Sequence, residues 1–200
     1  MSVTPQPVGR RERNKQAKLD RIIAAATELF AEHGVDEVTT LQIAEKADIG
    51  AGTLFLYAKS KGELLLLVQN SSYADALEKG KIAAEAIAGP LQAVMAIVRL
   101  IVECNRTQVD NGRTYLREMV FGDPQEPHHG EALRLTVETE HAIAKVLRRD
   151  SYTAPNEAPR LARAISAIMF LAMASVANAA SSVGDILAEI EGQIQAILPR

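Results

Sequence analysis

Apolar residues in the first part of the chain recur every three or four positions, the spacing that lines one face of an α-helix. These residues are Leu19, Ile22, Ile23, Ala26, Leu29 and Phe30. They predict a first helix from about Lys15 to His33. Gly34 follows at the position where glycine commonly caps a helix C-terminus, because it adopts left-handed backbone angles without a steric penalty.

Two much shorter helices are expected next. Thr39 stands three residues before Gln42, which is the spacing of a capping box at a helix start. The apolar stripe behind it is short and consists of Ile43, Ala44 and Ala47. The segment 48–50 interrupts the stripe, and Gly50 then precedes a third helix in which Leu54 faces inward. The pattern therefore predicts a three-helix module in which a tight turn joins two short helices.

The rest of the chain predicts longer helices. Ser60 and Glu63 form a second capping-box spacing, which opens a helix from Glu63 to about Ile87 and places a module boundary near Lys61. Helix-breaking residues divide the remainder so that six helices fit in it. They are Gly89-Pro90, Asn111-Gly112, Gly122-Asp123-Pro124 with Pro127, Pro155 with Pro159, and Gly184. No segment has the pattern of a strand, so the predicted fold is all-α with about nine helices.

Composition supports helices and adds a local charge asymmetry. Apolar residues make up 48% of the chain and aromatic residues 4%, with no Trp, which favours helices packed through Ala, Leu and Ile. The formal net charge is -3, but cations cluster near the N-terminus, with only Glu12 and Asp20 among them. The cations are Arg10, Arg11, Arg13, Lys15, Lys18 and Arg21. This end of the chain suits a polyanion.

Three further features bear on location. Cys104 is the only cysteine, so an intramolecular disulfide is impossible and a reducing cytoplasm is expected. The first nine residues lack the apolar core of a signal peptide. The most apolar stretch, Ala164 to Ala180, is shorter than the roughly 20 residues that span a bilayer. We therefore expect no membrane partner, and a helix there that is buried on both sides.

One segment of the chain resembles a known family. Residues 39–64 read TTLQIAEKADIGAGTLFLYAKSKGEL, and with LFAEHG at residues 29–34 they resemble the DNA-binding signature of the TetR family of repressors. The resemblance covers roughly residues 15–64. It implies an N-terminal helix-turn-helix domain followed by a C-terminal helical effector-binding and dimerisation domain. The expected division is a flexible basic arm (1–14), the DNA-binding domain (15–62) and the helical domain (63–200).

Four positions depart from the family's usual pattern. Asp48 replaces a common Gly, Phe55 a common Tyr, Ala58 a common Phe and Gly62 a common Glu. Asp tolerates a left-handed backbone better than most residues, so the turn at Asp48 stays plausible. Ala58 removes apolar volume behind the third helix.

The resemblance assigns roles in binding double-stranded operator DNA. Thr39, Tyr57 and Lys61 would contact backbone phosphates, through a helix N-terminus, a phenol hydroxyl and an ammonium group. Thr40 belongs to the same helix start. Base edges would be read by Gln42, Ala51, Gly52, Thr53 and Phe55. The basic residues Arg10, Arg11, Arg13 and Lys15 would follow phosphates or enter the minor groove.

The C-terminal helices resemble the family's two-helix dimerisation element. Between Arg160 and Ala180 apolar residues surround the helix, so one of its faces needs a partner. The last helix carries an apolar stripe of Ile186, Leu187, Ile190, Ile194 and Ile197. The implied homodimer through the last two helices would place two reading helices roughly 34 to 36 Å apart, which predicts a palindromic operator.

The family's scheme also implies a small-molecule effector among the middle helices, expected to be largely apolar. The effector would favour a conformer with wrongly spaced reading helices and so release the DNA. Candidate contacts are adaptable apolar or isolated polar groups. They are Met95, Arg99, Cys104, Tyr115, Met119, Phe121, Glu138, Met169, Phe170 and Met173.

Two other function classes stay open at this stage. A small all-α enzyme would recruit Glu138, Glu140 or His141, but Glu138 and Glu140 face different directions on a helix. A helical protein-interaction module without DNA binding is the other alternative. His128-His129 lack the fixed spacing of a metal site and are expected in a solvated, mobile loop from Pro124 to Gly130. Cys104 is expected to act as a small apolar residue. We predict no catalytic residue, metal or cofactor.

Overall fold

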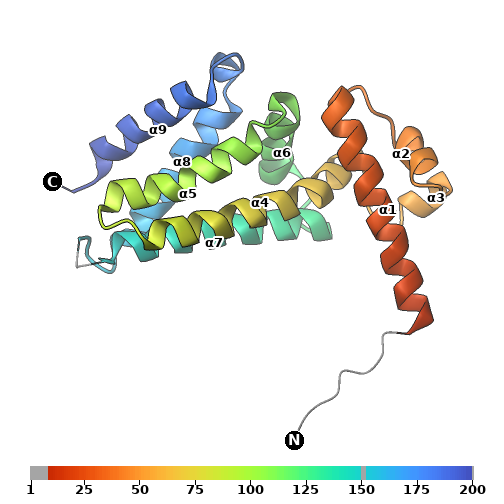
Figure 1. Cartoon of the computed structure of the whole chain (residues 1–200), viewed down its shortest axis with the longest axis horizontal. Coiled ribbons are helices and arrows are strands. Elements are labelled where there is room, and N and C mark those ends of the chain that lie inside the picture. The colour runs from red at the N-terminus through yellow and green to blue at the C-terminus, as the bar shows by residue number, and fades with distance from the viewer. Residues whose placement is uncertain (1–8, 150–151, 200) are drawn as a thin grey trace, which may run out of the picture.

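The computed structural model describes residues 9–149 and 152–199, and over those residues the chain is all-helical, as its sequence predicts (Figure 1). Nine α-helices and one short 3-10 helix, η2 (Val176–Asn178), make up the described part. The α-helices are α1 (Arg10–His33), α2 (Thr40–Lys46), α3 (Ala51–Leu54), α4 (Lys61–Glu85), α5 (Pro90–Asn105), α6 (Val109–Phe121), α7 (Pro127–Leu147), α8 (Ala158–Ala174) and α9 (Val183–Ile197). None of the described helices is long and apolar enough to cross a membrane.

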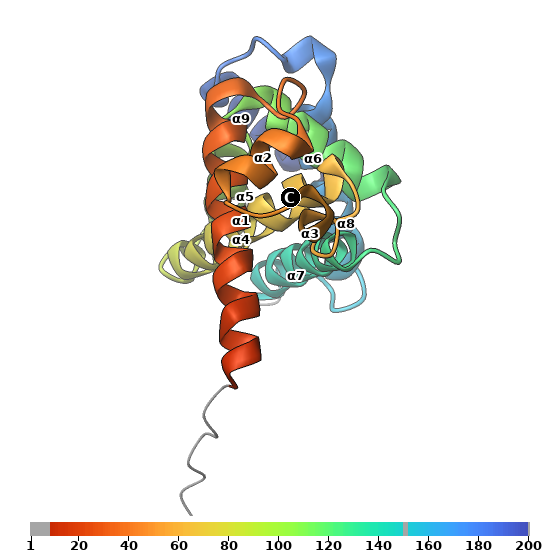
Figure 2. The same cartoon turned by 90° about the vertical axis from the view of Figure 1, so that its right-hand side faces the viewer.

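The helices form two parts, which we call the head (α1–α3) and the body (α4–α9). Figure 1 shows the head at one end of the molecule and the body extending away from it along α4. In the view turned by 90°, α1 lies across the end of the body, and its N-terminal half projects beyond the other helices (Figure 2). The projecting half of α1 is therefore open to a large partner.

A small apolar core holds the head together. Ile22 and Phe30 of α1, Ile43 of α2 and Leu54 of α3 are all buried. α1 ends as expected at Gly34, whose φ of 77° is left-handed and whose N–H donates to the carbonyl of Phe30 at 3.0 Å. Full burial of one such side chain stabilises a fold by about 1.5–3 kcal/mol, so four suffice to fix two short helices on a longer one.

α4 is the central helix of the body and packs along α5, α6 and α7. The closest approach to α5 is at Gly80, where an added Cβ would lie 2.9 Å from the Cα of Ile97. Only glycine permits this spacing, so the two helices pack nearly backbone to backbone. α8 packs on α7 and α9, and α9 also contacts α5.

The first helix begins earlier than predicted. We expected a flexible arm up to residue 14, but α1 starts at Arg10. The residues 10–14 are Arg, Arg, Glu, Arg and Asn, mostly good helix formers, and Glu12 lies in the first turn, where a carboxylate favours the helix dipole. Apolar periodicity misses these residues because none of them is apolar. The rest of the expected arm, residues 1–8, lies outside the described residues.

Two expected breaks lie inside helices. Asn111-Gly112 falls in the first turn of α6, where the Gln108 side chain accepts a hydrogen bond from the Asn111 N–H at 2.6 Å. Gly184 likewise falls in the first turn of α9, which a Ser182–Asp185 capping box starts. Gly112 fits there because an added Cβ would collide with the carbonyl oxygen of Asn105.

The segment expected as a mobile loop is shorter than 124–130. α7 begins at Pro127, since proline at the first helical position has a preset φ and needs no donor. His128 and His129 are therefore helical, and His129 is buried instead of lying in a solvated loop.

Candidate nucleic-acid interface

The start of α2 is fixed by the predicted capping box. The Thr39 hydroxyl accepts from the Gln42 N–H at 3.2 Å, and the Gln42 side-chain oxygen accepts from the Thr39 N–H at 2.8 Å. The same oxygen also accepts from the Thr39 hydroxyl at 2.9 Å. Gln42, expected to read a base, thus has its oxygen engaged within the head, and its Nε2 is the group left to face a base.

The turn between α2 and α3 is rigid. Asp48 has a φ of 53°, which is the left-handed conformation that Asp tolerates better than most residues. The N–H of Ile49 donates to the carbonyl of Ala44 at 3.0 Å, and Arg21 of α1 pairs with the Asp48 carboxylate at 3.3 Å. The turn is therefore tied both to α2 and to α1.

α3, the expected reading helix, is a single turn. It buries one side chain and leaves the other residues half-buried or exposed. Leu54 is fully buried beneath it, whereas Gly52 is exposed and Ala51 and Thr53 are half-buried. Phe55 is 47% exposed and Leu56 is 83% exposed. The outward surface of this helix is thus mostly apolar, with Thr53 as its hydrogen-bonding group.

Leu56 is a candidate contact that sequence reasoning missed. An apolar side chain this exposed next to a recognition helix has no role in the core of the head. The signal in the sequence is its place two residues after the buried Leu54, which turns it away from the core in a one-turn helix.

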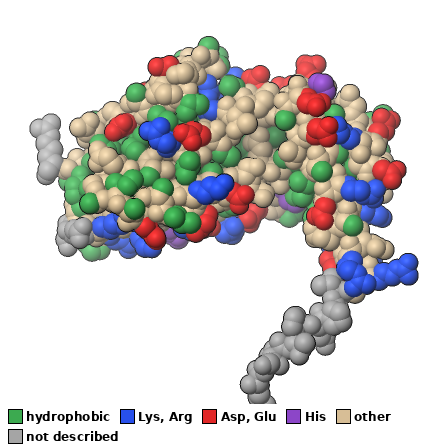
Figure 3. Space-filling model, viewed as in Figure 1, with side chains coloured by type: hydrophobic (Ala, Val, Ile, Leu, Met, Phe, Trp, Pro, Cys, Tyr) green, Lys and Arg blue, Asp and Glu red, His purple; other side chains and the backbone are tan. Residues whose placement is uncertain are grey.

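A basic groove runs between the projecting half of α1 and α3. Its volume is about 910 Å³, and it brings together many of the sequence-predicted contacts. Its lining includes Arg10, Arg11, Lys15, Lys18, Thr53, Leu56 and Tyr57. Figure 3 shows Lys and Arg side chains gathered over this end of the molecule. Five of the thirteen expected DNA contacts thus line the groove, and the other eight do not: Arg13, Thr39, Thr40, Gln42, Ala51, Gly52, Phe55 and Lys61.

The two expected phosphate ligands after α3 are anchored to the head. The Tyr57 hydroxyl donates to the carbonyl of Lys15 at 3.3 Å, and the Lys61 ammonium donates to the carbonyl of Asp36 at 3.0 Å. Both groups retain hydrogen-bonding capacity, because a hydroxyl also accepts and an ammonium has three donors. Tyr57 lines the basic groove, whereas Lys61 lies outside it, at the turn that follows the other end of α1.

The start of α4, directly after the head, is fastened to α7 through polar contacts that the sequence did not reveal. The second expected capping box at Ser60 forms only in part: the Ser60 hydroxyl accepts from the Glu63 N–H at 3.0 Å. The Glu63 carboxylate accepts instead from the backbone N–H groups of His128 and His129, at 3.3 and 3.1 Å. Burial raises the pKa of Glu63. A side chain expected to serve its own helix thus caps the N-terminus of α7.

A chain of hydrogen bonds continues from this cap. The His128 ring Nε2 lies 2.9 Å from the carbonyl of Tyr57, which is in the turn that follows α3. The amide of Asn70 donates to the carbonyl of His128 at 2.9 Å and accepts from the Tyr115 hydroxyl at 2.9 Å. Burial raises the pKa of Tyr115, so its hydroxyl stays a donor. These hydrogen bonds link the turn after the reading helix to α4, α6 and α7.

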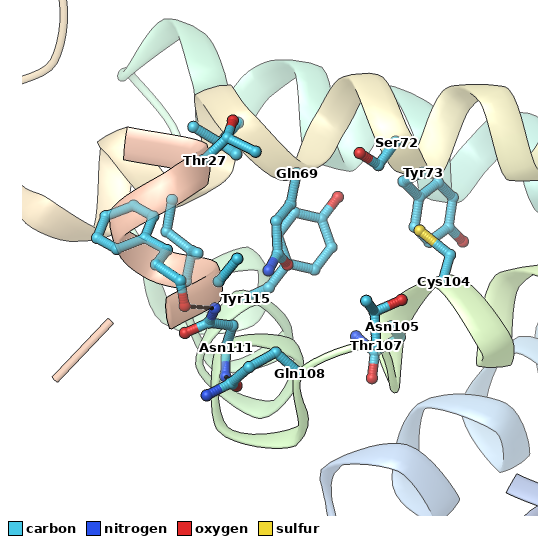
Figure 4. Close-up of a pocket in the computed structure, with 14 residues that line it drawn as sticks. Thr27, Gln69, Ser72, Tyr73, Cys104, Asn105, Thr107, Gln108, Asn111 and Tyr115 are labelled. Carbon is cyan, nitrogen blue, oxygen red and sulfur yellow. Dashed lines mark hydrogen bonds between the residues drawn. The ribbon is translucent and has the colours of Figure 1, made fainter. Parts of the chain in front are cut away.

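The expected effector contacts are spread over several places. Cys104 and Tyr115 line a pocket of about 170 Å³ where α1 meets the body, shown in Figure 4. Phe121 and Phe170 line a separate hollow of about 350 Å³. Four of the others lie in the core, namely Met95, Met119, Met169 and Met173.

The two charged members of the set make ion pairs near the surface. Arg99 lies 4.0 Å from Glu103, and Glu138 pairs with Arg134 at 2.9 Å and with Lys81 at 3.4 Å. Glu138, the candidate acid of an enzyme, is therefore engaged with two cations. The described residues contain no cluster of three His, Cys, Asp or Glu that could hold a metal.

Comparison with known proteins finds a family to which the head is similar. Residues 22–68 match the model of the bacterial regulatory proteins of the tetR family. The chain is 41% identical over 54 residues to an uncharacterized HTH-type transcriptional regulator of Haemophilus influenzae, covering 26% of the chain and 29% of that protein. It is 32% identical over 102 residues to the HTH-type transcriptional regulator TcmR of Streptomyces glaucescens, covering 48% of the chain and 45% of that protein. The matches thus span less than half the length of these curated relatives.

Solved structures extend the likeness to the whole fold. One is Thermus thermophilus FadR, a TetR family transcriptional repressor in complex with lauroyl-CoA, with a TM-score of 0.72 and 23% identity over 91% of this chain and 96% of that one. Another is a TetR transcriptional regulator from Rhodococcus sp. RHA1, with a TM-score of 0.69 and 17% identity over 92% of this chain and 96% of that one. The family match in the head and the shared architecture of head and body agree. The head is therefore similar to the bacterial regulatory proteins of the tetR family, and the described chain shares the fold of solved TetR-family regulators.

Proposed function

We propose that the chain is a ligand-responsive repressor that binds a palindromic operator as a homodimer and is released by a small-molecule effector. The observation that carries the DNA-binding part is the basic groove between α1 and α3, which places Arg10, Arg11, Lys15 and Tyr57 on one surface with the exposed side of the reading helix. Such a surface pairs phosphate contacts with base contacts. A protein of this function works in the cytoplasm.

The proposed dimer uses α8 and α9. Leu171 on α8 is 68% exposed and Val176 just after it is 74% exposed, which is unusual for large apolar residues beside the core. Pairing these helices with those of a second copy would bury them and set the distance between the two heads. A monomer would bind DNA weakly, because one short reading helix contacts few bases.

The effector part draws on the body of the protein and on a relative. Thermus thermophilus FadR, which shares the fold, was solved with lauroyl-CoA bound. For this chain the proposal is that α4, which joins head and body, transmits occupancy of a site in the body to the head. A shift of about 5- to 150-fold in operator affinity is the usual range of such coupling.

A gel shift with the promoter region of the chain's own gene tests DNA binding. The double variant Tyr57→Phe with Lys61→Ala removes a hydroxyl and an ammonium from the proposed phosphate contacts, so affinity should fall tenfold or more, since charged hydrogen bonds contribute about 1.5–3 kcal/mol. Lys79→Ala, an exposed lysine on α4, is the matched control and should bind like the parent. Unchanged binding by a folded, dimeric double variant would exclude this DNA contact.

Sedimentation tests the dimer. Leu171→Asp should give a monomer that loses operator affinity, because an unpaired carboxylate would have to be buried in the interface. Val137→Asp is the control, since Val137 is also exposed but lies on α7. A dimer that survives Leu171→Asp would place the interface elsewhere.

A further inference from the structure

We propose that the pocket between α1, α4, α5 and α6 is an effector site for a small, uncharged, mostly apolar molecule, and that its occupant acts directly on the angle between head and body. This inference rests on the proposed function, because it names the site and the chemical class of the effector. We call this pocket the junction pocket (Figure 4).

The size and lining of the junction pocket define the class of ligand. Its volume is about 170 Å³. Drug-sized ligands occupy sites of about 300–1,000 Å³, whereas an apolar cavity of about 150 Å³ holds benzene. None of the 14 described residues that line it is Lys, Arg, Asp, Glu or His. A charged ligand would lose its hydration there without gaining a counterion, so the pocket selects a neutral molecule about the size of one ring.

Polar groups on the walls add a preference for one hydrogen-bonding edge. Gln69 and Ser72 of α4 line the pocket, and their side chains make no hydrogen bond to another described residue. Asn105, which is 7% exposed, also lines it and leaves its Oδ1 without a partner among the described residues. The aromatic wall is supplied by Tyr73 and Tyr115, whose stacked rings lie 6.2 Å apart. A phenol, a small aryl amide or a lactone has this combination of one ring and one polar edge.

The position of the pocket explains how an occupant would act. Thr27, Phe30 and Ala31 on one wall belong to α1 of the head, whereas the remaining walls belong to the body. Asn111 also lines the pocket and binds the Phe30 carbonyl at 2.7 Å, so the occupant lies beside the polar contact that fastens the head. A molecule that touches both parts favours one head angle over others, and its effect does not have to pass through the core of the body.

The single thiol of the chain allows this proposal to be tested by covalent occupancy. Cys104 lines the junction pocket, and Figure 4 shows its sulfur on the α4 side, toward Tyr73. Burial raises the pKa of the thiol, so the reaction is run at mildly alkaline pH. With benzyl methanethiosulfonate, the Cys104 thiolate forms a mixed disulfide and methanesulfinate leaves, which places one neutral ring in the pocket.

The benzyl adduct, verified by mass spectrometry and helical by circular dichroism, should bind the operator at least about fivefold more weakly than the untreated protein. Reduction should restore affinity, and treated Cys104→Ser should not change. An adduct that binds as well as the untreated protein overturns the junction pocket while leaving the proposed repressor intact. Failure of the untreated protein to bind DNA would instead overturn the proposed function.

A matched pair of variants tests whether the reagent enters through the pocket. Ser71 and Ser72 are neighbouring exposed residues of α4, and only Ser72 lines the pocket. Ser72→Trp should slow modification of Cys104 by at least about fivefold, whereas Ser71→Trp should leave its rate within about twofold, because access controls the rate of thiol exchange. Equal rates for the two variants would show that the reagent does not enter through the pocket. No modification of the native parent protein would show that the pocket does not admit a ring. Either result would overturn the proposal.

Discussion

The side-chain amide of Asn111, at the start of α6, donates to the carbonyl of Phe30 in α1 at 2.7 Å, while its oxygen accepts from the N–H of Val35 at 2.7 Å. One buried residue of the body thus binds both sides of the turn that ends the long helix of the head. Together with the contact between the His128 ring of α7 and the Tyr57 carbonyl just after α3, it makes the head orientation depend on hydrogen bonds to the body.

Asn111→Ala should destabilise the protein by about 1–3 kcal/mol, because it leaves the buried Val35 N–H without its partner. Chemical denaturation monitored by circular dichroism measures this. Asn14→Ala, at an exposed position of α1, should change the free energy of unfolding by less than about 0.5 kcal/mol. Similar values for the two variants would mean that water replaces the contacts of Asn111.

Glu63 predicts a specific pH dependence. Burial raises the pKa of its carboxyl, so between the ordinary carboxyl pKa and the raised value the folded state holds more proton than the unfolded state. The free energy of unfolding from this group is therefore highest at acid pH and falls as the pH rises through that window. Glu63→Gln removes this titration.

Denaturation curves at pH 4 to 7 test the prediction. The difference in free energy of unfolding between parent and Glu63→Gln should shift in favour of the variant as the pH rises, even if Gln is the weaker acceptor for the two N–H groups of α7. Parallel pH profiles for the two proteins would contradict the raised pKa.

These contacts also mark how far the sequence could predict the structure. The head could be predicted because its sequence signals are local: Gly34 caps α1, Thr39 pairs with Gln42, and Asp48 adopts the left-handed conformation of the turn. Each involves residues within about four positions of one another, so spacing alone reveals them.

The hydrogen bonds between distant segments could not be predicted from the sequence, because the residues that form them are far apart along the chain. Glu63 has the same local signature as Gln42, yet its carboxylate binds residues 65 and 66 positions away. Asn111-Gly112 has the composition of a break, but Asn111 is held 81 positions from Phe30. A capping residue has several acceptable partners, and the packing of α7 on α4 decides between them. The scatter of the expected effector residues has the same cause, since Met and Phe periodicity does not distinguish core from pocket.

Leu56 predicts how bases are read. This side chain is 83% exposed, lies in the basic groove and offers only apolar surface, so a thymine methyl group is its natural partner. Leu56→Ala should leave the melting temperature unchanged and weaken operator binding by about 1 kcal/mol. Replacing individual thymines of the operator with deoxyuridine, which lacks the methyl group, identifies the contact.

The deoxyuridine scan separates this contact from its neighbour. At the position read by Leu56, the parent protein should lose affinity on loss of the methyl group, whereas Leu56→Ala should not respond. Phe55→Ala serves as the control and should still respond there, because Phe55 is the adjacent exposed side chain and is expected to contact a different base from the thymine read by Leu56. If Leu56→Ala remains as sensitive to every thymine as the parent, Leu56 does not read a methyl group.

Asp48 sets two physical effects against each other, and their magnitudes predict the sign of a substitution. Its φ of 53° is left-handed, which costs a residue other than glycine roughly 1–2 kcal/mol, although Asp is among the better tolerated. Its ion pair with Arg21 at 3.3 Å is exposed and so contributes about 0–1 kcal/mol. Asp48→Gly should therefore leave stability unchanged or raise it slightly, whereas Asp48→Ala, which loses the ion pair and keeps the strain, should lower the melting temperature. Arg21→Ala isolates the ion-pair contribution; if it costs more than Asp48→Ala, the salt bridge and not the backbone conformation decides the residue at this turn.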